Sequence, residues 1–387
     1  MTTSGPPIDP VAFEKMRRIA PNLLAGRRDG DAADWGARPL PEEIAFKLTN
    51  RCDLRCAHCY QWGADGYHHH LAAGDRHGDL DLALVARMLE ATRPVRSNVY
   101  LWGGEPLVYR DWDGLVELLA NDPRWTSVCT NGTLIERRLP SLLRLGRHLE
   151  LSISLDGFEA EHDALRGGGS FERTWRGLRL LLERKEAREF EGQATVNFVI
   201  SDAMVARMYE FVALLDHAGV DTVYVSLPWY LAAEGAARMD AYFAKHYGWE
   251  IGPGRPSWHS YTFRLDPEHI AALEAQMARI DAAQWRIKVR YNPRIEGDDL
   301  RPFILGSDQP AQQKTRCQST RTRMDVFPNG DVVSCKFFPE FRVGNLHDAD
   351  FEAIWRGPRF DQVRATVFEC GLMPACAKCN LLYTRGM

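Results

Sequence analysis

The sequence predicts an α/β protein built as a partial (β/α)6 barrel, and the order of its apolar segments is the main reason. Short apolar or alternating runs that are typical of strands occur six times, with amphipathic helical segments between them. The six predicted strands are 44–49, 98–102, 126–130, 149–155, 194–200 and 222–227. Strands that alternate with helices favour a parallel sheet with right-handed crossovers. Six units are fewer than the eight of a closed barrel, so we expect an open-sided barrel over residues 44–230.

Three further segments complete the predicted organisation. Residues 1–43 form an N-terminal extension rich in Pro, Gly and Asp, in which the amphipathic stretch 9–24 predicts a helix that packs on the barrel. Residues 231–310 connect the barrel to the C-terminal region. The Trp- and Tyr-rich stretch 228–266 is expected to be irregular and to cover the mouth of the barrel. Residues 311–387 are expected to form a small domain with a β-hairpin and a helix.

The composition excludes several classes of protein. A net charge of −4 over 387 residues gives no electrostatic reason to expect nucleic acid or an anionic membrane as a partner. No apolar run reaches the roughly 18–20 residues needed to span a bilayer, and the N-terminus lacks the apolar core of a secretory signal. The expected location is therefore the cytoplasm. Thiols stay reduced there, so the nine cysteines are expected to be ligands or catalysts rather than disulfides.

Three of these cysteines lie together directly after the first predicted strand. Cys52, Cys56 and Cys59 have the spacing C-x3-C-x2-C, at the end of the barrel strands where functional loops are found. Structural zinc sites use four ligands, whereas three thiolates leave one position open. An iron–sulfur cluster in which one iron binds an additional ligand suits that arrangement.

The strand ends that follow carry three short polar motifs. They are GGEP at 103–106, TNG at 130–132 and SLDG at 154–157. With the cysteine triplet, these motifs resemble the radical S-adenosylmethionine (SAM) enzymes, and the resemblance covers about residues 44–380. The family usually has an aromatic residue before the third cysteine, whereas this chain has His58. His58 is expected either to stack near an adenine or to lie in a solvated loop.

The resemblance implies a [4Fe-4S] cluster and SAM as cofactors. Cys52, Cys56 and Cys59 would hold three irons, and the fourth iron would bind the amine and carboxylate of SAM. The other implied SAM-binding residues are Gly103, Gly104, Glu105 and Pro106 for the amine, Ser154 and Arg166 for the carboxylate, and Asn131 and Asp156 near the ribose or adenine. Turn or capping roles are the alternative for the last four. The cluster would cleave SAM to a 5′-deoxyadenosyl radical that abstracts hydrogen, with a flavodoxin or ferredoxin-type protein as electron donor.

The C-terminal region carries five more cysteines. Cys317 and Cys335 enclose a C-x12-G-x4-C stretch, in which 324–335 predicts a hairpin. This stretch and the later cysteines resemble the SPASM/twitch extension of radical SAM enzymes, and five cysteines favour one auxiliary [4Fe-4S] cluster. The implied ligands are Cys317, Cys335, Cys376 and Cys379, with Cys370 left over or exchanging roles with Cys376. A zinc site is the alternative.

Cys129 stands apart from both groups of cysteines. Strand alternation places it on the same face as Asn131, toward the barrel interior. A thiol there could give a hydrogen atom to a substrate radical; the alternative is a small buried apolar residue. The three adjacent histidines at 68–70 are expected to lie in a solvated loop, because neighbouring side chains point in different directions.

The sequence predicts a radical SAM enzyme of specialised metabolism, and three kinds of substrate chemistry remain open. The main expectation is a sugar-like small molecule that undergoes epimerisation or dehydrogenation, because the 43 residues before the first strand look short for a leader-peptide-binding domain. The alternative is a maturase of a ribosomally made peptide. A hypothesis from another class is a zinc-stabilised module that binds a nucleotide without turning it over.

Overall fold

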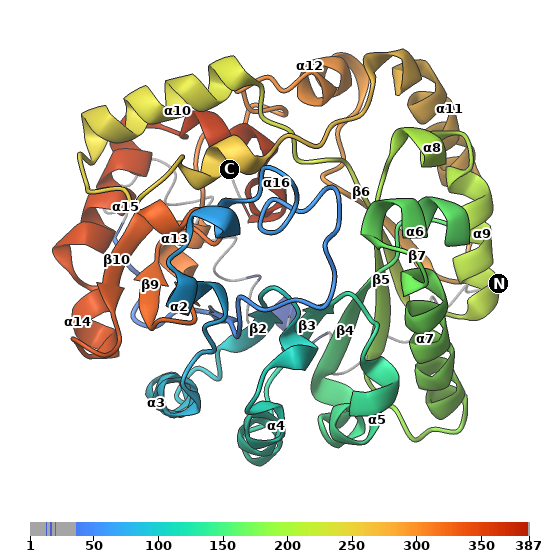
Figure 1. Ribbon diagram of the computed structural model, residues 1–387, viewed down its shortest axis with the longest axis horizontal. Helices are drawn as coiled ribbons and strands as arrows, with labels where there is room; N and C mark the ends of the chain where they lie inside the picture. Colours follow the sequence, from blue (N-terminus) through green and yellow to red (C-terminus); the bar gives the residue numbers. More distant parts are fainter. Residues whose placement is uncertain (1–12, 14–15, 18–19, 21–35, 386–387) are drawn as a thin grey trace.

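One curved, ten-stranded sheet forms the centre of the protein (Figure 1). The computed structural model describes residues 36–385 together with residues 13, 16, 17 and 20. The helix predicted at 9–24 therefore falls mostly outside the described residues. The strand order is β10-β9-β8-β1-β2-β3-β4-β5-β6-β7.

The six strands expected from the sequence are present and follow one another in the sheet. They are β1 (Glu43–Lys47), β2 (Asn98–Trp102), β3 (Thr126–Thr130), β4 (Leu149–Ser154), β5 (Gln193–Val199) and β6 (Thr222–Ser226). Each pairs in parallel with the next. The predicted α/β fold with a parallel partial barrel is thus confirmed. All six strands end on the same side, where their following loops meet.

Two more parallel strands extend this sheet at its edges. β7 (Lys288–Asn292) pairs with β6, and β8 (Arg323–Val326) pairs with β1. The sequence analysis missed β7, because Lys288 and Arg290 interrupt its apolar residues and are exposed. Charged side chains are typical of an edge strand, where they discourage pairing with another chain.

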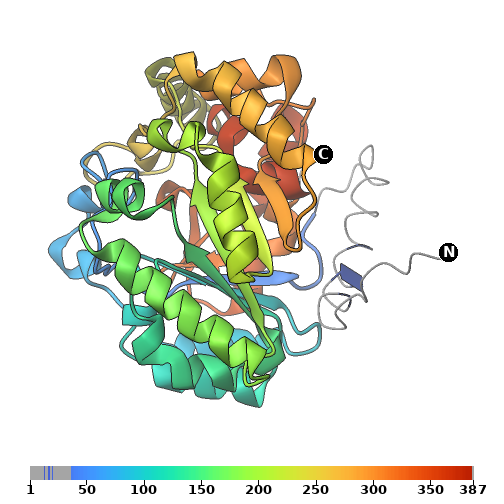
Figure 2. The same cartoon turned by 90° about the vertical axis from the view of Figure 1, so that its right-hand side faces the viewer.

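Amphipathic helices cover the outer face of the sheet (Figures 1 and 2). The principal ones are α3 (Leu82–Ala91), α4 (Trp112–Asn121), α5 (Ile135–Arg144), α6 (Glu159–Arg166), α7 (Ser170–Glu186), α9 (Met208–Ala218) and α11 (Ile270–Ala282); shorter helices are α2 (Ala73–Arg76), α8 (Asp202–Val205) and α12 (Leu300–Ile304). The main core lies between the helices and the sheet. A small second cluster around Ala45 and Trp102 lies on the inner face, because alternate residues of a strand point to opposite sides.

The segment after β6 contains a helix that the sequence analysis did not predict. The expectation of an irregular segment over 228–266 is wrong for α10 (Ala233–His246), a 14-residue helix. Its buried face consists of Gly235, Ala236, Met239 and Phe243. Small residues at two of these positions weaken the apolar periodicity that identifies a helix, and the flanking Trp and Tyr residues obscured it further.

The C-terminal region continues the barrel sheet. β8 and β9 (Asp331–Val333) form the predicted hairpin, and β10 (Arg342–Asn345) is antiparallel to β9. Gly330 in the turn has φ +82°, which favours glycine. The helices of this region are α13 (Ser319–Thr322), α14 (Phe351–Trp355), α15 (Pro358–Cys370) and α16 (Asn380–Arg385). Since β8 pairs with β1, the cysteine-bearing region is attached directly to the first strand of the barrel.

No described helix has both the length and the apolar character that crossing a membrane requires.

Substitution of Phe243 would test how far α10 contributes to the packing of the C-terminal region. Its ring is 1% exposed, and its centroid lies 5.2 Å from that of Phe341 and 5.4 Å from that of Trp258. We expect Phe243→Ala to lower the free energy of unfolding by about 3–5 kcal/mol, because it leaves a cavity in a packed aromatic cluster. Urea denaturation measures this. The exposed Lys245→Ala on the same helix is the control, and an equal effect of both variants would contradict the packing described.

Candidate functional site

A cavity of about 340 Å³ opens where the barrel strands end. The three cysteines of the first loop, Cys52, Cys56 and Cys59, all line it. Backbone amides point at two of the sulfurs: the Leu54 amide lies 3.4 Å from Cys52 Sγ, and the Trp62 amide lies 3.4 Å from Cys59 Sγ. Such donors stabilise thiolates over thiols. Burial is the main reason that the pKa of Cys56 is raised to about 11, and the nearby Arg166 guanidinium opposes this shift.

The Gly-Gly turn after β2 packs directly on the backbone that precedes Cys52. The amides of Gly104 and Glu105 donate to the carbonyls of Thr49 and Arg51, each at 2.8 Å. A Cβ atom on Gly104 would lie 2.2 Å from the Arg51 carbonyl oxygen, and one on Gly103 would lie 2.5 Å from that of Thr49. Glycine is therefore required here by the contact between two loops. The resemblance had implied only that these two glycines bind the amine of SAM.

Glu105 joins this turn to the end of β3. Its carboxylate is buried and accepts hydrogen bonds from the Leu107 amide at 2.9 Å, Thr130 Oγ1 at 2.7 Å and the Asn131 amide at 2.7 Å. Burial raises its pKa to about 7 in spite of these donors. Pro106 begins the following short 3₁₀ turn and is not among the residues that line the cavity.

Asn131 joins the end of β3 to the cysteine loop. Its Nδ2 donates to Asp53 Oδ1 at 2.7 Å and lies 4.0 Å from Cys52 Sγ. Thr133 Oγ1 donates to the other oxygen of Asp53 at 2.6 Å. The sequence analysis missed Asp53, because nothing in its local pattern distinguishes it from an ordinary loop residue.

Arg166 and Asp156 form a buried ion pair beside Cys56. Arg166 Nε donates to Asp156 Oδ2 at 2.5 Å, and its Nη1 lies 3.9 Å from Cys56 Sγ. Arg166 and Ser154 line the cavity, whereas Asp156 is fully buried behind them and also accepts from the Val199 amide at 2.9 Å. The Arg166 guanidinium and His58 help hold the pKa of Asp156 below its usual value, against the effect of burial. Asp156 thus positions Arg166 and does not itself face the cavity.

His58 lies at the same place and is not a solvated residue. Its Nε2 is 3.4 Å from Asp156 Oδ2, and its ring centroid is 5.4 Å from that of Phe263. Burial lowers its pKa to about 4, so the ring is neutral at pH 7. Both rings line the cavity.

Cys129 lies on the inner face of β3, as strand alternation predicts, and lines the cavity. Its neighbours include Tyr100, whose hydroxyl accepts a hydrogen bond from Lys336 Nζ at 3.1 Å. Three aromatic residues complete this wall; two come from the segment after β6 and one from the segment between β9 and β10. The Trp229 ring centroid lies 3.9 Å from that of Tyr261 and 4.4 Å from that of Phe337.

The histidine run contains one buried residue, which corrects the expectation of a solvated loop. His68 is 0% exposed, while His69 and His70 are exposed. Lys47 Nζ lies 2.9 Å from His68 Nε2 and donates to the Tyr67 hydroxyl at 2.9 Å. Burial holds the pKa of His68 well below its usual value, so the neutral ring can accept the lysine's hydrogen bond.

Four C-terminal cysteines line a second, more enclosed cavity. They are Cys317, Cys335, Cys376 and Cys379. Among the described residues, no three His, Cys, Asp or Glu side chains converge on the position of a single metal ion. Four cysteines that line one enclosed cavity suit the thiolate ligand set of an iron–sulfur cluster. Cys370 is exposed, and its Sγ lies 3.9 Å from His246 Nδ1 outside this cavity.

The two cavities share a wall. Trp229, Lys336 and Phe337 line both of them. The first cysteine loop and the C-terminal cysteines therefore line two neighbouring cavities that these three side chains separate. Cys129 opens into the first cavity near this wall.

Comparison with protein families agrees with this geometry. Residues 46–190 match the Radical SAM superfamily, and residues 317–380 match SPASM, an iron–sulfur cluster-binding domain. The chain is a radical SAM enzyme with a C-terminal SPASM-type domain. It accordingly binds SAM, a [4Fe-4S] cluster and an auxiliary cluster.

Curated relatives align along most of the chain. Pre-heme d1 synthase of Dinoroseobacter shibae is 26% identical over 338 residues, 83% of this chain and 75% of the relative. Mycofactocin maturase MftC of Mycobacterium ulcerans is 27% identical over 345 residues, 87% and 79%. PqqA peptide cyclase of Gluconobacter oxydans is 26% identical over 335 residues, 84% and 80%.

A solved structure shares the fold. Streptococcus suis SuiB bound to the precursor peptide SuiA superposes with a TM-score of 0.58 at 16% identity, over 99% of this chain and 78% of that one.

Glu105 provides a test of how the site is assembled. Glu105→Ala leaves the Leu107 amide, the Thr130 hydroxyl and the Asn131 amide without their acceptor. We expect the free energy of unfolding to fall by about 1–3 kcal/mol, measured by urea denaturation at neutral pH. Glu117→Ala, at a carboxylate that is 55% exposed and pairs with Arg144, is the control. No difference between the two variants would show that the Glu105 carboxylate does not join the loops.

Proposed function

We propose that this radical SAM enzyme modifies a peptide. The observation that carries the proposal is the similarity to PqqA peptide cyclase, which extends over 84% of this chain and therefore includes both the barrel and the cysteine-bearing C-terminal region. SuiB, which shares the fold, has been solved with its precursor peptide. The expected sugar-like substrate has no support among these relatives, and the shortness of the N-terminal segment is no argument against a peptide.

The first cavity has the features that a peptide side chain requires. Its volume of about 340 Å³ lies within the usual range of small-molecule sites. Trp229, Tyr261 and Phe263 supply apolar and aromatic surface, whereas Asn197 and Asn292 supply amides that can bind backbone groups. These residues come from different strand ends and from the segment after β6, so a bound peptide would contact several elements at once.

We propose that Cys52, Cys56 and Cys59 hold the SAM-binding cluster. Arg166 then lies where it can pair with the carboxylate of SAM, with Asp156 holding the guanidinium in place. Ser154 is the second proposed carboxylate ligand. The turn at 103–106 would accept the amine through its carbonyl oxygens, and Asn131 would lie near the ribose or adenine. When bound, the cluster and SAM supply a 5′-deoxyadenosyl radical, which abstracts hydrogen from an unactivated position.

We propose that Cys317, Cys335, Cys376 and Cys379 hold one auxiliary cluster, with Cys370 outside the ligand set. In this organisation residues 44–230 form the SAM-binding barrel and residues 311–387 the auxiliary domain. Residues 231–310 connect them and cover the substrate, and residues 1–43 precede the barrel. The shared wall of Trp229, Lys336 and Phe337 would keep the auxiliary cluster close to the substrate while excluding water from both cavities.

Cys129 is the residue of this chain best placed to act on a substrate radical. It lines the first cavity from the inner face of β3. A thiol S–H at this position could give a hydrogen atom to a carbon-centred radical, which would change the configuration of a peptide residue. If Cys129 is only a small buried residue, the reaction would instead remove hydrogen from the peptide.

The iron content tests the two proposed cluster sites. We expect anaerobically reconstituted protein to bind about eight irons, in two clusters of four. Changing Cys52, Cys56 and Cys59 together to Ala should leave about four and abolish reductive cleavage of SAM. Iron and acid-labile sulfide analysis measures both. About twelve irons in the wild type would indicate a second auxiliary cluster, and SAM cleavage by the triple variant would refute the first site.

Isotope transfer tests the peptide proposal. Candidate precursor peptides deuterated at single residues should transfer the label into 5′-deoxyadenosine, and mass spectrometry should locate the altered residue. If Cys129 donates hydrogen, Cys129→Ala should still form 5′-deoxyadenosine but lose the epimerised product. Ser127→Ala, on the same face of β3, is the control. Label transfer from sugar-like substrates and from no peptide would reject the peptide proposal.

A further inference from the structure

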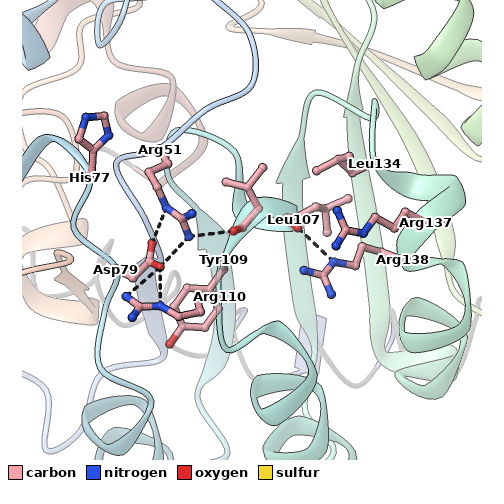
Figure 3. Close-up of a pocket in the computed structure, with 10 residues that line it drawn as sticks. Arg51, His77, Asp79, Leu107, Tyr109, Arg110, Leu134, Arg137 and Arg138 are labelled. Carbon is pink, nitrogen blue, oxygen red and sulfur yellow. Dashed lines mark hydrogen bonds and ion pairs between the residues drawn. The ribbon is translucent and has the colours of Figure 1, made fainter.

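A strongly basic recess of about 500 Å³ lies on the outer side of the loops that follow β1, β2 and β3 (Figure 3). Four arginines line it: Arg51, Arg110, Arg137 and Arg138. Asp79 is the one carboxylate among its lining residues. The protein as a whole has a net charge of −4, so this concentration of positive charge is local.

Nearby carboxylates offset part of this charge. Arg51 pairs with Asp79 at 2.6 Å, and Arg110 lies 3.4 Å from the same oxygen. Across the recess, Arg138 pairs with Asp113 at 3.6 Å, and its Nε donates to the Leu107 carbonyl at 3.2 Å (Figure 3). The Arg137 side chain is exposed and makes no hydrogen bond or ion pair with the described part of the chain. The Arg110 side chain is 74% exposed in spite of its contact with Asp79, so both guanidinium groups can be reached from solvent.

The recess and the substrate cavity lie on opposite sides of the same turn. Gly103, Gly104 and Glu105 line the cavity, whereas Leu107 and Val108 line the recess. Arg51, the residue before Cys52, belongs to the recess and donates to the Val108 carbonyl at 3.0 Å. The outer surface at the recess is therefore separated from the cysteine loop by little more than this turn.

The chemistry of the first cluster requires an electron from outside the protein, while the cavity must stay closed to water and to other hydrogen donors. An electron donor that docked at the cavity mouth would compete with the substrate. A donor at the recess would avoid this conflict. Because electron tunnelling falls steeply with distance, a docking surface directly behind the cysteine loop is favourable.

We propose that this recess is the docking site for an acidic, low-potential one-electron carrier protein that contains a flavin or an iron–sulfur centre. The carrier is oxidised by one electron, the first cluster is reduced by one electron, and no atom is transferred. Complementary charge would steer the carrier to the recess and orient it there. This inference rests on the radical SAM chemistry and not on the peptide proposal.

An acidic segment of a peptide substrate would also complement the positive charge of the recess. The position of the recess nevertheless favours the electron carrier over the peptide. The recess faces away from the cavity, so a peptide held there would have to pass around the turn at 103–106 to reach Cys129 or SAM. A redox protein needs no such path, because only an electron has to cross the turn.

Charge reversal at the two available arginines tests the proposal. The variant is Arg110→Glu with Arg137→Glu, and the probe is flavodoxin, an acidic flavin carrier. We expect its affinity for the reconstituted holoenzyme, measured by calorimetry at low ionic strength, to fall at least about tenfold. Reduction of the cluster by flavodoxin hydroquinone, followed by absorbance, should slow by a similar factor. Wild-type binding should also weaken as salt is added, because the charges lie at the surface.

Two controls separate docking from other effects. Lys245→Glu with Arg301→Glu makes the same change in net charge at exposed positions on α10 and α12, and should bind flavodoxin as the wild type does. Dithionite reduces the cluster without docking, so the rate of SAM cleavage with dithionite should be unchanged in both double variants. An unchanged rate also shows that the site remains folded. A third variant, Arg110→Gln with Arg137→Gln, removes the two positive charges without reversing them. Its affinity for flavodoxin should lie between that of the wild type and that of the charge-reversal variant.

Two results would overturn the proposal. Unchanged flavodoxin affinity and reduction rate in the Arg110/Arg137 variant would show that the carrier docks elsewhere. Retained flavodoxin binding with loss of peptide binding would assign the recess to the substrate instead. Neither measurement with flavodoxin requires a peptide, so failure of the peptide proposal would leave the docking result intact.

Discussion

The backbone of the first cysteine loop rests on the backbone of the turn after β2, and the site is assembled around this contact. Gly104 and Glu105 donate to the carbonyls of Thr49 and Arg51, and the absence of side chains at Gly103 and Gly104 allows the approach. Both segments lie just beyond the paired strands β1 and β2, so the parallel pairing of these strands brings the two segments together. Their buried backbone groups then satisfy one another.

Three carboxylates extend this arrangement to the next strands. Glu105 joins the turn after β2 to β3, Asp53 joins the cysteine loop to Asn131 and Thr133, and Asp156 holds Arg166 beside Cys56. Each accepts hydrogen bonds from at least two residues. Glu105 and Asp156 are buried, and an unpaired donor or charge is costly away from water, so these two carboxylates hold their partners in one relative position. Asp53 is exposed and makes its two contacts at the edge of the site.

The shared wall between the two cysteine sites explains how one chain can combine radical formation with an auxiliary cluster. β8 pairs with β1, so the strand that leads to the first cysteine loop also carries the hairpin before Cys335. Trp229, Lys336 and Phe337 then separate the two cavities by single side chains. The basic recess lies on the far side of the first loop, which leaves the cavity itself to the substrate.

The sequence by itself determined the six barrel strands, the cysteine triplet and the motifs at the strand ends, because these depend on local periodicity and on spacing along the chain. It left open whether Cys370 or Cys376 stands apart from the other C-terminal cysteines, and the structure places Cys376 in the second cavity and Cys370 outside it. The tertiary structure alone decided that Lys288–Asn292 joins the sheet, that Ala233–His246 is a helix and that His68 is buried. It also decided that Asp156 acts behind Arg166 and that Asp53 holds Asn131. Each of these depends on which distant residues become neighbours, and burial and hydrogen bonding between such residues leave no period in the sequence.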